Sequence, residues 1–330
     1  MSERYIITTK TPFRITFSGG GTDLPYYFRT YGTGVSVSAT INSYVYITIS
    51  KHFYEDELRI SYSTTENAIK NIEEIKHPTI REAMKLLKMK TGIQLVSITE
   101  IPSQGTGLGS SSSFLVGVLN ALHAWKGEVP TPKQLAEEAI NIERNILKEP
   151  GGFQDQYAAA YGGINTMEFF SDDTVAIKRI PLSRNARKEL ESNLILFYTG
   201  SERSSLKIHK QQAVQISNKI DSYKKMSKIA YETGDALSKL DFKKLGSLLD
   251  ENWKLKQTLS TGITTDFINA YYNKAINAGA LGGKLIGAGG SGFLLFIVPN
   301  DKREEVKKAV NLKEHNFEIE PQGSRVIYVD

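Results

Sequence analysis

Glycine and serine crowd into one short stretch of the sequence, residues 105–113 (GTGLGSSSS). Three glycines at alternate positions disfavour a regular helix or strand, because glycine loses the most backbone entropy on ordering. The apolar run 114–122 that follows predicts a buried helix. A glycine loop leading into a helix presents unpaired N–H groups at the positive end of the helix dipole, which suits polyphosphate. The alternative from the residues alone is a flexible loop before a core helix.

Two acidic residues follow in positions that could do chemistry. The segment 131–134 (TPKQ) has the form of a helix start, so we expect a helix over 132–148. Glu143 interrupts the apolar row of that helix, and a carboxylate there needs either a metal ion or a nearby arginine. Asp155 follows the turn Gly151-Gly152 and is either a functional acid or a helix N-cap. The row of Glu143 has spacings of four, three and four: Ala136, Ile140, Glu143 and Leu147.

Two further glycine turns could bring backbone close to a ligand. The first, Gly19 to Gly21, lies between Arg14 and Asp23. It ends a segment, residues 4–17, that we expect to form one strand or a strand pair interrupted at Pro12. Asp23 either binds a ligand there or caps the turn. The last turn, residues 287–292 (GAGGSG), matches the letters of a dinucleotide-binding loop, but a predicted strand follows it where a helix is required. The sequence contains no Walker A motif either, so we expect neither a dinucleotide fold nor a P-loop.

Composition and charge narrow the class of protein. The chain has 330 residues, 40% of them hydrophobic and 23% charged, which suits one large or two ordinary globular domains. It has no cysteine and five scattered histidines, so we expect no disulfide framework and no histidine metal centre. The net charge of +5 is spread among nearly as many acids. This fits a small anionic substrate, and no basic stripe with interleaved aromatic residues indicates nucleic acid.

The N-terminus has no apolar signal core, and no stretch of about 18 uncharged apolar residues occurs. We therefore expect a cytoplasmic protein with no membrane partner. Strand and helix patterns alternate in an α+β order. The composition becomes charged and turn-rich from residue 172, and we expect one domain over residues 1–185 and a second over 186–330. The oligomeric state stays open.

Three ordered segments together resemble the motifs of the GHMP small-molecule kinases, a family that includes galactokinase, homoserine kinase and mevalonate kinase. They are residues 12–23 (PFRITFSGGGTD), Pro102 with residues 107–112 (GLGSSS), and residues 286–292 (IGAGGSG). Their order and spacing cover nearly the whole chain. The resemblance implies an α+β, two-domain GHMP kinase fold: an N-terminal domain with a left-handed βαβ crossover, and a ferredoxin-like C-terminal domain.

The resemblance also implies which residues bind ATP, Mg²⁺ and the acceptor. Ser111 and Glu143 would hold Mg²⁺, since hydroxyl and carboxylate oxygens suit a hard octahedral cation. Asp155 would be the base or the orienter of the attacking hydroxyl, with Arg14 beside it and the γ-phosphate. The ATP phosphates would bind the glycine loop, made of Gly105, Thr106, Gly107, Leu108, Gly109, Ser110 and Ser111.

Within the family, the run 19–28 (GGGTDLPYYF) resembles sugar kinases that act on an anomeric hydroxyl, of the heptose 7-phosphate and fucose types. The implied reaction is ATP-dependent phosphorylation at C1, with D-glycero-D-manno-heptose 7-phosphate as the acceptor. A fucose or glucuronate kinase and an inactive sugar or nucleotide sensor are the alternatives. Galactokinases carry a Glu-His pair where this chain has Gly20 and Gly21, which argues against galactose.

The acceptor would contact the first glycine turn through Asp23, Gly20 and Gly21. Gly289 either touches the acceptor or only shapes a tight turn. Arg203 and Lys207 lie in a serine-rich turn after a predicted strand. They are candidates for holding a second phosphate on the acceptor, and the alternative is solvated surface charge.

Overall fold

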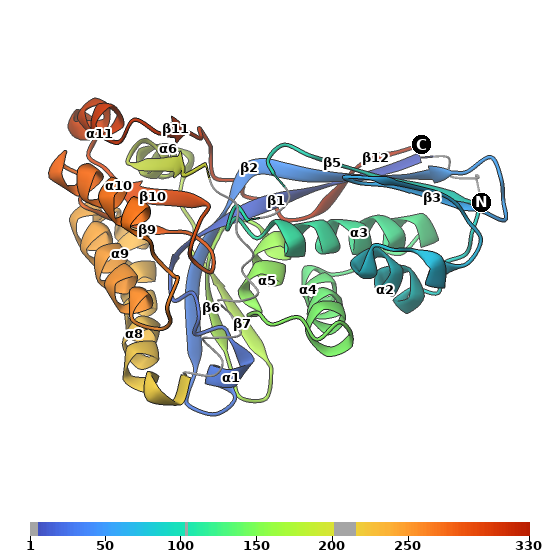
Figure 1. Cartoon of the computed structure of the whole chain (residues 1–330), viewed down its shortest axis with the longest axis horizontal. Helices are drawn as coiled ribbons and strands as arrows, with labels where there is room; N and C mark the ends of the chain where they lie inside the picture. The colour runs from blue at the N-terminus through green and yellow to red at the C-terminus, as the bar shows by residue number, and fades with distance from the viewer. Residues whose placement is uncertain (1–5, 103–104, 201–215) are drawn as a thin grey trace.

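Two sheets organise the chain, of which the computed structural model describes residues 6–102, 105–200 and 216–330 (Figure 1). In the larger sheet the strand order is β12-β1-β2-β5-β3-β4; β6 pairs with the first half of β2, and β7 pairs with β6. The strands of this sheet are β1 (Ile6–Ser18), β2 (Gly34–Lys51), β3 (Leu58–Ser61), β4 (Thr65–Ile69), β5 (Ile93–Thr99), β6 (Ile164–Phe169), β7 (Val175–Arg179) and β12 (Arg325–Val329).

The second half of β1 brings the site into the middle of the molecule. Residues 6–10 alternate between partly exposed and buried, as expected for a strand with one covered face, whereas residues 11–18 are all buried. Helices α3 (Ser110–Lys126), α5 (Gln154–Tyr161), α8 (Ile220–Lys239) and α9 (Phe242–Gln257) all contact β1. Arg14 and the turn after β1 are therefore enclosed by both halves of the chain.

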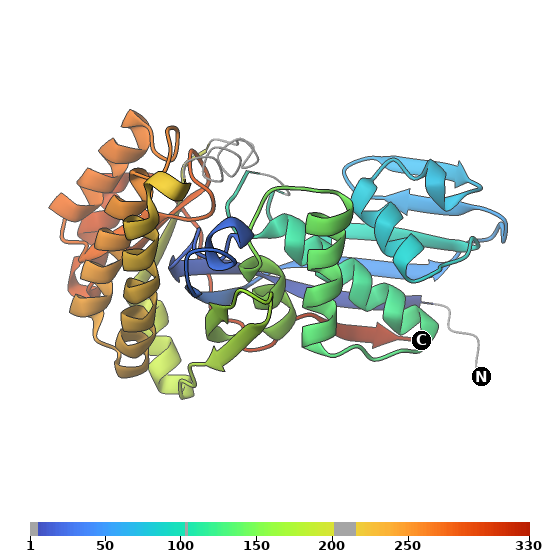
Figure 2. The ribbon, with the colours of Figure 1, turned by 90° about the horizontal axis from the view of Figure 1, so that it is seen from below.

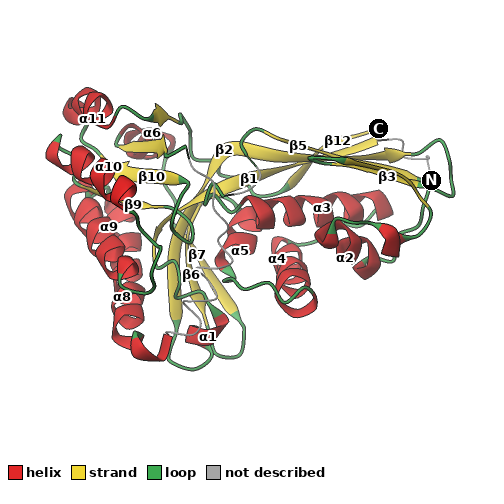
Figure 3. Cartoon of the chain, in the orientation of Figure 1, coloured by secondary structure: helices red, strands yellow, loops and turns green. Residues whose placement is uncertain are grey.

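The helices of the first half of the chain cover one face of the larger sheet (Figure 3), and α8 also packs on its strands β1, β2 and β6. Its central helix is α3, which packs on β1 and β2. The others in this half are α1 (Pro25–Phe28), α2 (Pro78–Leu86), α4 (Pro132–Ile140) and α5. The helix predicted over 132–148 is wrong in its last part, because α4 passes at Asn141–Ile146 into a π-helical turn, a feature often found at functional sites. In the described ranges, no helix is long and apolar enough to cross a membrane.

The smaller sheet has the ferredoxin-like strand order. Its strands are β8 (Leu194–Tyr198), β9 (Gly282–Leu285), β10 (Phe293–Ile297) and β11 (Lys313–Glu314). They lie in the order β11-β8-β10-β9, which is 4-1-3-2 in chain order, and helices separate the first strand from the second and the third from the fourth. The helices of this half gather at one end of the molecule (Figure 2). They are α6 (Arg184–Ser192), α8, α9, α10 (Asp266–Asn277) and α11 (Arg303–Val310). The predicted ferredoxin-like region is confirmed.

The end of the chain returns to the larger sheet. After β11 in the smaller sheet, residues 318–324 already bond to β2 and to the segment around α5, and β12 then pairs antiparallel with β1. The predicted boundary near residue 185 falls within α6. The division into 1–185 and 186–330 stays a prediction, with β12 then counted with the first unit. The left-handed crossover also stays a prediction.

His123, near the end of α3, ties that helix to its neighbours. The buried ring lies 2.7 Å from Glu128 and 2.8 Å from Glu138 on α4. Burial alone lowers the pKa of His123, but the hydrogen bonds to Glu138 and Glu128 outweigh it, so the pKa is raised above 6.5. A histidine with a raised pKa stabilises the fold fully below the unfolded pKa, and the contribution is lost as pH rises through the folded pKa.

We therefore expect His123→Gln to lower the melting temperature strongly at about pH 5.5 and much less at about pH 8.5. Thermal unfolding of wild type and variant at both pH values measures this difference. His52→Gln, in a loop away from α3, serves as the control. A difference between wild type and His123→Gln that is independent of pH would contradict the assignment.

Candidate active site

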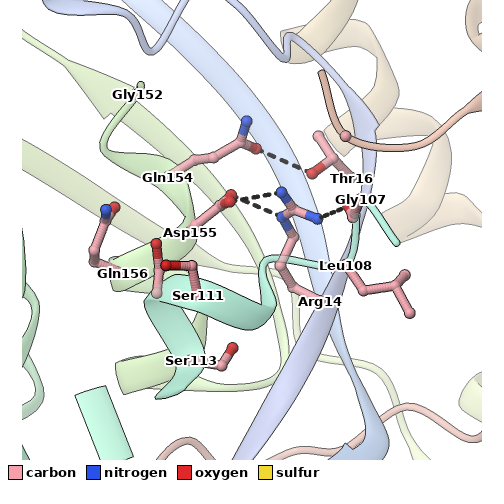
Figure 4. A network of polar contacts seen from close by, with 12 residues as sticks. Arg14, Thr16, Gly107, Leu108, Ser111, Ser113, Gly152, Gln154, Asp155 and Gln156 are labelled. Atoms are coloured by element: carbon pink, nitrogen blue, oxygen red, sulfur yellow. Dashed lines mark hydrogen bonds and ion pairs between the residues drawn. The ribbon is translucent and has the colours of Figure 1, made fainter. Parts of the chain in front are cut away.

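An ion pair joins β1 to α5 at the centre of the site. Arg14 donates from Nε to Asp155 Oδ1 at 2.8 Å and from Nη2 to Oδ2 at 2.7 Å (Figure 4). Its Nη1 donates to the Gly107 carbonyl, and its backbone N–H donates to the Leu108 carbonyl at 3.0 Å. The Arg14 side chain is 5% exposed and the Asp155 side chain 25%. The carboxylate is therefore the member of the pair that a ligand can reach.

The glycine loop has left-handed backbone at each of its glycines. Gly105, Gly107 and Gly109 have φ of 72°, 75° and 73°, a conformation that costs other residues about 1–2 kcal/mol. Gly109 is the N-cap of α3, and no side chain caps that helix start. The positive end of α3 therefore points at the loop without a capping oxygen, an arrangement suited to phosphate. Thr106 and Leu108 are fully buried and anchor the loop.

The loop packs backbone to backbone against the third glycine turn, which belongs to the other half of the chain. A Cβ atom on Gly107 would overlap the Ile286 carbonyl oxygen, and one on Gly292 would overlap the Thr106 carbonyl oxygen. Gly289 lies against Ile263, where an added Cβ would come within 2.8 Å of the backbone. Its contact with a substrate stays a prediction.

Glu143 is buried on the π-helical turn and surrounded by donors. Ser112 Oγ lies 3.1 Å from Oε2, Ser111 Oγ lies 3.4 Å from Oε1, and Gln156 Nε2 also donates to Oε2. Arg144 Nη2 lies 3.4 Å from Oε2. The sequence predicted either a nearby arginine or a metal ion beside Glu143. The structure places Arg144 beside the carboxylate, and the hydroxyls of Ser111 and Ser112 supply further oxygen atoms that could bind a metal ion.

The oxygen atoms around Glu143 fit Mg²⁺ that is shared with phosphate. Among the described residues, no group of three or more His, Cys, Asp or Glu could hold a metal ion by itself. Mg²⁺ typically takes one or two carboxylates and fills its other positions with waters and phosphate oxygens. Ser111 is exposed and Ser112 buried, so Ser111 is the hydroxyl that an incoming ligand meets first. The residues present fit the cation.

Asp23 lies buried between the first glycine turn and the start of α5. The N–H of Gly21 donates to Oδ1 at 2.9 Å, and the N–H of Gln154 donates to Oδ2 at 3.3 Å. A Cβ atom on Gly152 would overlap Asp23 Oδ2, so only glycine fits there. Burial, and secondly the charge of Asp155, raises the pKa of Asp23. Asp23 thus caps its own turn and also joins it to α5.

Two buried lysines that the sequence analysis missed complete the site. Lys256, at the end of α9, is 4% exposed, and its Nζ donates to the Gly287 carbonyl. Lys284, on β9, is 1% exposed. Burial lowers the pKa of Lys256 to about 8, and burial together with the charge of Lys256 lowers the pKa of Lys284.

The sequence did carry a signal for both lysines. Lys284 is the only charged residue between Lys274 and Asp301. Lys256 lies on a helical row with the spacing that singled out Glu143: Leu245, Leu249, Asn252 and Lys256. Two other predicted substrate residues, Arg203 and Lys207, lie outside the described residues.

Comparison with known proteins identifies the class. Residues 67–163 match the profile of the GHMP kinases N terminal domain, and residues 235–316 match that of the GHMP kinases C terminal domain. The chain is similar to D-glycero-alpha-D-manno-heptose 7-phosphate kinase of Campylobacter jejuni, with 32% identity over 94% of each chain. It is also similar to galactokinase of Pyrococcus furiosus, with 26% identity over 92% of each.

A solved structure titled as a D-glycero-D-manno-heptose 1-phosphate kinase from Bacteroides thetaiotaomicron superposes with a TM-score of 0.82 at 27% identity, covering 98% of this chain and 99% of that one. The chain therefore belongs to the GHMP kinase family. This membership confirms the prediction that the chain is an ATP-dependent sugar kinase.

Gly107→Ala tests whether the glycine loop depends on its contact with Ile286. We expect the variant to unfold at a lower temperature and its kcat/KM for ATP to fall at least about tenfold, because a misplacement of 1 Å in a site can cost far more. Gly262→Ala is the matched control: its φ of 81° imposes the same backbone strain, but nothing lies within 4 Å of the added Cβ. Equal losses of kcat/KM in the two variants would contradict the role of the contact.

Proposed function

We propose that the chain transfers the γ-phosphoryl group of ATP to the anomeric (C1) hydroxyl of D-glycero-D-manno-heptose 7-phosphate, which gives the 1,7-bisphosphate. The observation that carries the proposal is the position of the Asp155 carboxylate. It is joined through Arg14 to the glycine loop at the start of α3, and it lies close enough to Asp23 to raise that carboxyl's pKa. A hydroxyl held at Asp155 would thus lie between a phosphate loop and a polar acceptor pocket. The similarity to the heptose 7-phosphate kinase supports the choice of acceptor.

The proposed reaction places the phosphates of ATP at the loop Gly105 to Ser111 and at the start of α3. The exposed Ser111 and the buried Glu143 would hold Mg²⁺, and Ser112 and Gln156 fix the orientation of Glu143 through their hydrogen bonds. When bound, Mg²⁺ neutralises charge on the phosphate oxygens.

Asp155 accepts a hydrogen bond from the attacking hydroxyl and orients it. Both of its oxygens already accept from Arg14, and a loose phosphoryl transition state needs little deprotonation of the nucleophile. Orientation is therefore its main contribution. Arg14 brings positive charge next to the phosphoryl group as the group moves, which is the larger electrostatic effect in this class of reaction.

The acceptor sugar binds against the first glycine turn. Gly20 and Gly21 add no side chain of their own to the turn, and Asp23 supplies a buried acceptor for sugar hydroxyls. The buried Tyr223 hydroxyl has no hydrogen-bond partner among the described residues, and its ring lies 3.5 Å from the position that a Cβ on Gly21 would take. A sugar hydroxyl would satisfy it.

A panel of acceptors tests the proposal. ATP consumption in the presence of Mg²⁺ is compared for heptose 7-phosphate, unphosphorylated heptose, fucose, glucuronate and galactose, and the product is identified by ³¹P NMR. We expect heptose 7-phosphate to have a kcat/KM at least about tenfold above the others, with the new phosphate at C1. Faster turnover of fucose or glucuronate would instead support the alternative sugar kinases, and no turnover would support a sensor.

Asp155→Asn tests the acid at the centre. We expect kcat to fall at least about a hundredfold, a typical acid–base or orienting contribution, while ATP still binds because the loop and Glu143 are untouched. Steady-state kinetics and calorimetric nucleotide titration measure the two effects. Asp173→Asn, which removes an exposed partner of Arg29 far from the loop, is the control. Near-normal turnover in Asp155→Asn would remove Asp155 from the mechanism.

A further inference from the structure

Among the described residues, the interior around Asp23 holds three basic side chains and two carboxylates. Arg14, Lys256 and Lys284 are all buried, and the carboxylates that act on them are Asp23 and Asp155. Arg14 is matched by its two-point contact with Asp155. In the part of the chain that the structure describes, Asp23 then remains as the one carboxylate for two lysines, and burial lowers the pKa of both lysines. Burying an unmatched charge is costly.

Neither lysine reaches a carboxylate within the described ranges. The Nζ atom of Lys256 donates to the Gly287 carbonyl, and no hydrogen bond or ion pair of Lys284 is formed there. Asp23 acts on Lys256 more strongly than Arg14 or Asp155 does, and Asp155 is not among the charges that act on Lys284. Both lysines are therefore affected by the charge of Asp23, whereas Asp155 acts on Lys256 alone.

Donors converge on the bare backbone of Gly20. A Cβ atom placed there would lie 3.6 Å from Gln154 Nε2 and 3.7 Å from Lys256 Nζ. Gln154 Oε1 accepts from Thr16 Oγ1 at 3.1 Å, which turns the Nε2 donor away from β1 (Figure 4). An amide N–H and an ammonium group thus flank a position that no side chain of the turn fills. Oxygen atoms that carry negative charge suit such a position.

We propose that Lys256 and Lys284, with Gln154, form a binding site for a phosphate group next to Asp23. This inference rests on the proposed function, which supplies two sources of that chemistry. One is the phosphate that the acceptor already carries, and the other is the phosphoryl group in transfer. Bound phosphate provides a further counter-charge, and it raises the affinity of both lysines for their protons.

The first test needs no turnover. Thermal unfolding is measured for wild type, Lys256→Met, Lys284→Met and the control Lys254→Met, which removes an exposed lysine paired with Asp250 on the same helix. Without ligand, we expect Lys256→Met and Lys284→Met to melt above wild type, because either change removes a basic group that is costly to bury and that contacts no carboxylate among the described residues. Inorganic phosphate should raise the melting temperature of wild type and Lys254→Met, and raise it much less in the other two. A lower melting temperature with an undiminished response to phosphate would overturn the proposal.

The second test distinguishes the two sources of phosphate. If the site binds the acceptor's phosphate, Lys256→Met raises KM for heptose 7-phosphate at least about tenfold and leaves KM for unphosphorylated heptose unchanged, as for loss of a charged hydrogen bond. If it binds the phosphoryl group in transfer, kcat falls about equally on both sugars and each KM stays near the wild-type value. Unchanged kinetics on both sugars would overturn the proposal. Wild type that phosphorylates neither heptose refutes the proposed function alone, and the phosphate site is then decided by the unfolding test.

Discussion

The two-point contact between Arg14 and Asp155 is the interaction on which the rest of the site depends. A guanidinium group is planar and presents donors in a fixed fork, so its two bonds to one carboxylate fix the angle between β1 and α5. The third nitrogen of the guanidinium group, Nη1, donates to the Gly107 carbonyl and thereby fixes the loop. A lysine at position 14 could supply the positive charge, but it could not donate in the same fixed geometry to both Asp155 oxygens and the Gly107 carbonyl. The phosphate loop, the acid and the strand are positioned by one side chain.

Backbone contact between the two halves of the chain is the second constraint. The glycine loop and the turn 287–292 approach so closely that a methyl group on Gly107 would overlap the carbonyl of Ile286. Gly292 also accepts, through its carbonyl, both the N–H and the hydroxyl of Thr199 at the end of β8. The loop is therefore supported by the smaller sheet even though α3 belongs to the larger one. A phosphate loop held by both halves responds to any shift of one half against the other.

Sequence alone predicted the parts of this site that rest on local chemistry. Glycine turns, the helix after the loop and the carboxylate of Glu143 on an apolar row follow from residue types and spacing within a few turns. The approach of the turn 287–292 to Gly107, and the return of β12 to β1, join residues far apart in the chain, and no local pattern encodes such contacts. The π-helical turn at Asn141–Ile146 was missed for a different reason, because its residue spacing fits an ordinary helix equally well. Lys256 was missed because a lysine in an amphipathic helix is usually a surface residue, and only the tertiary packing of α9 buries this one.

Buried charge explains why the site is built at the junction of two halves. In a lysine that packs within one half of the chain only, the long aliphatic stem usually lets the ammonium group reach water. At the junction, α9 packs against both β1 and β9, and Lys256 and Lys284 lose that route. The fold tolerates this because its large apolar core offsets the cost of a few buried charges, whereas a small domain could not. The same burial makes each charge act more strongly on a bound anion than it would at the surface, since less water screens it.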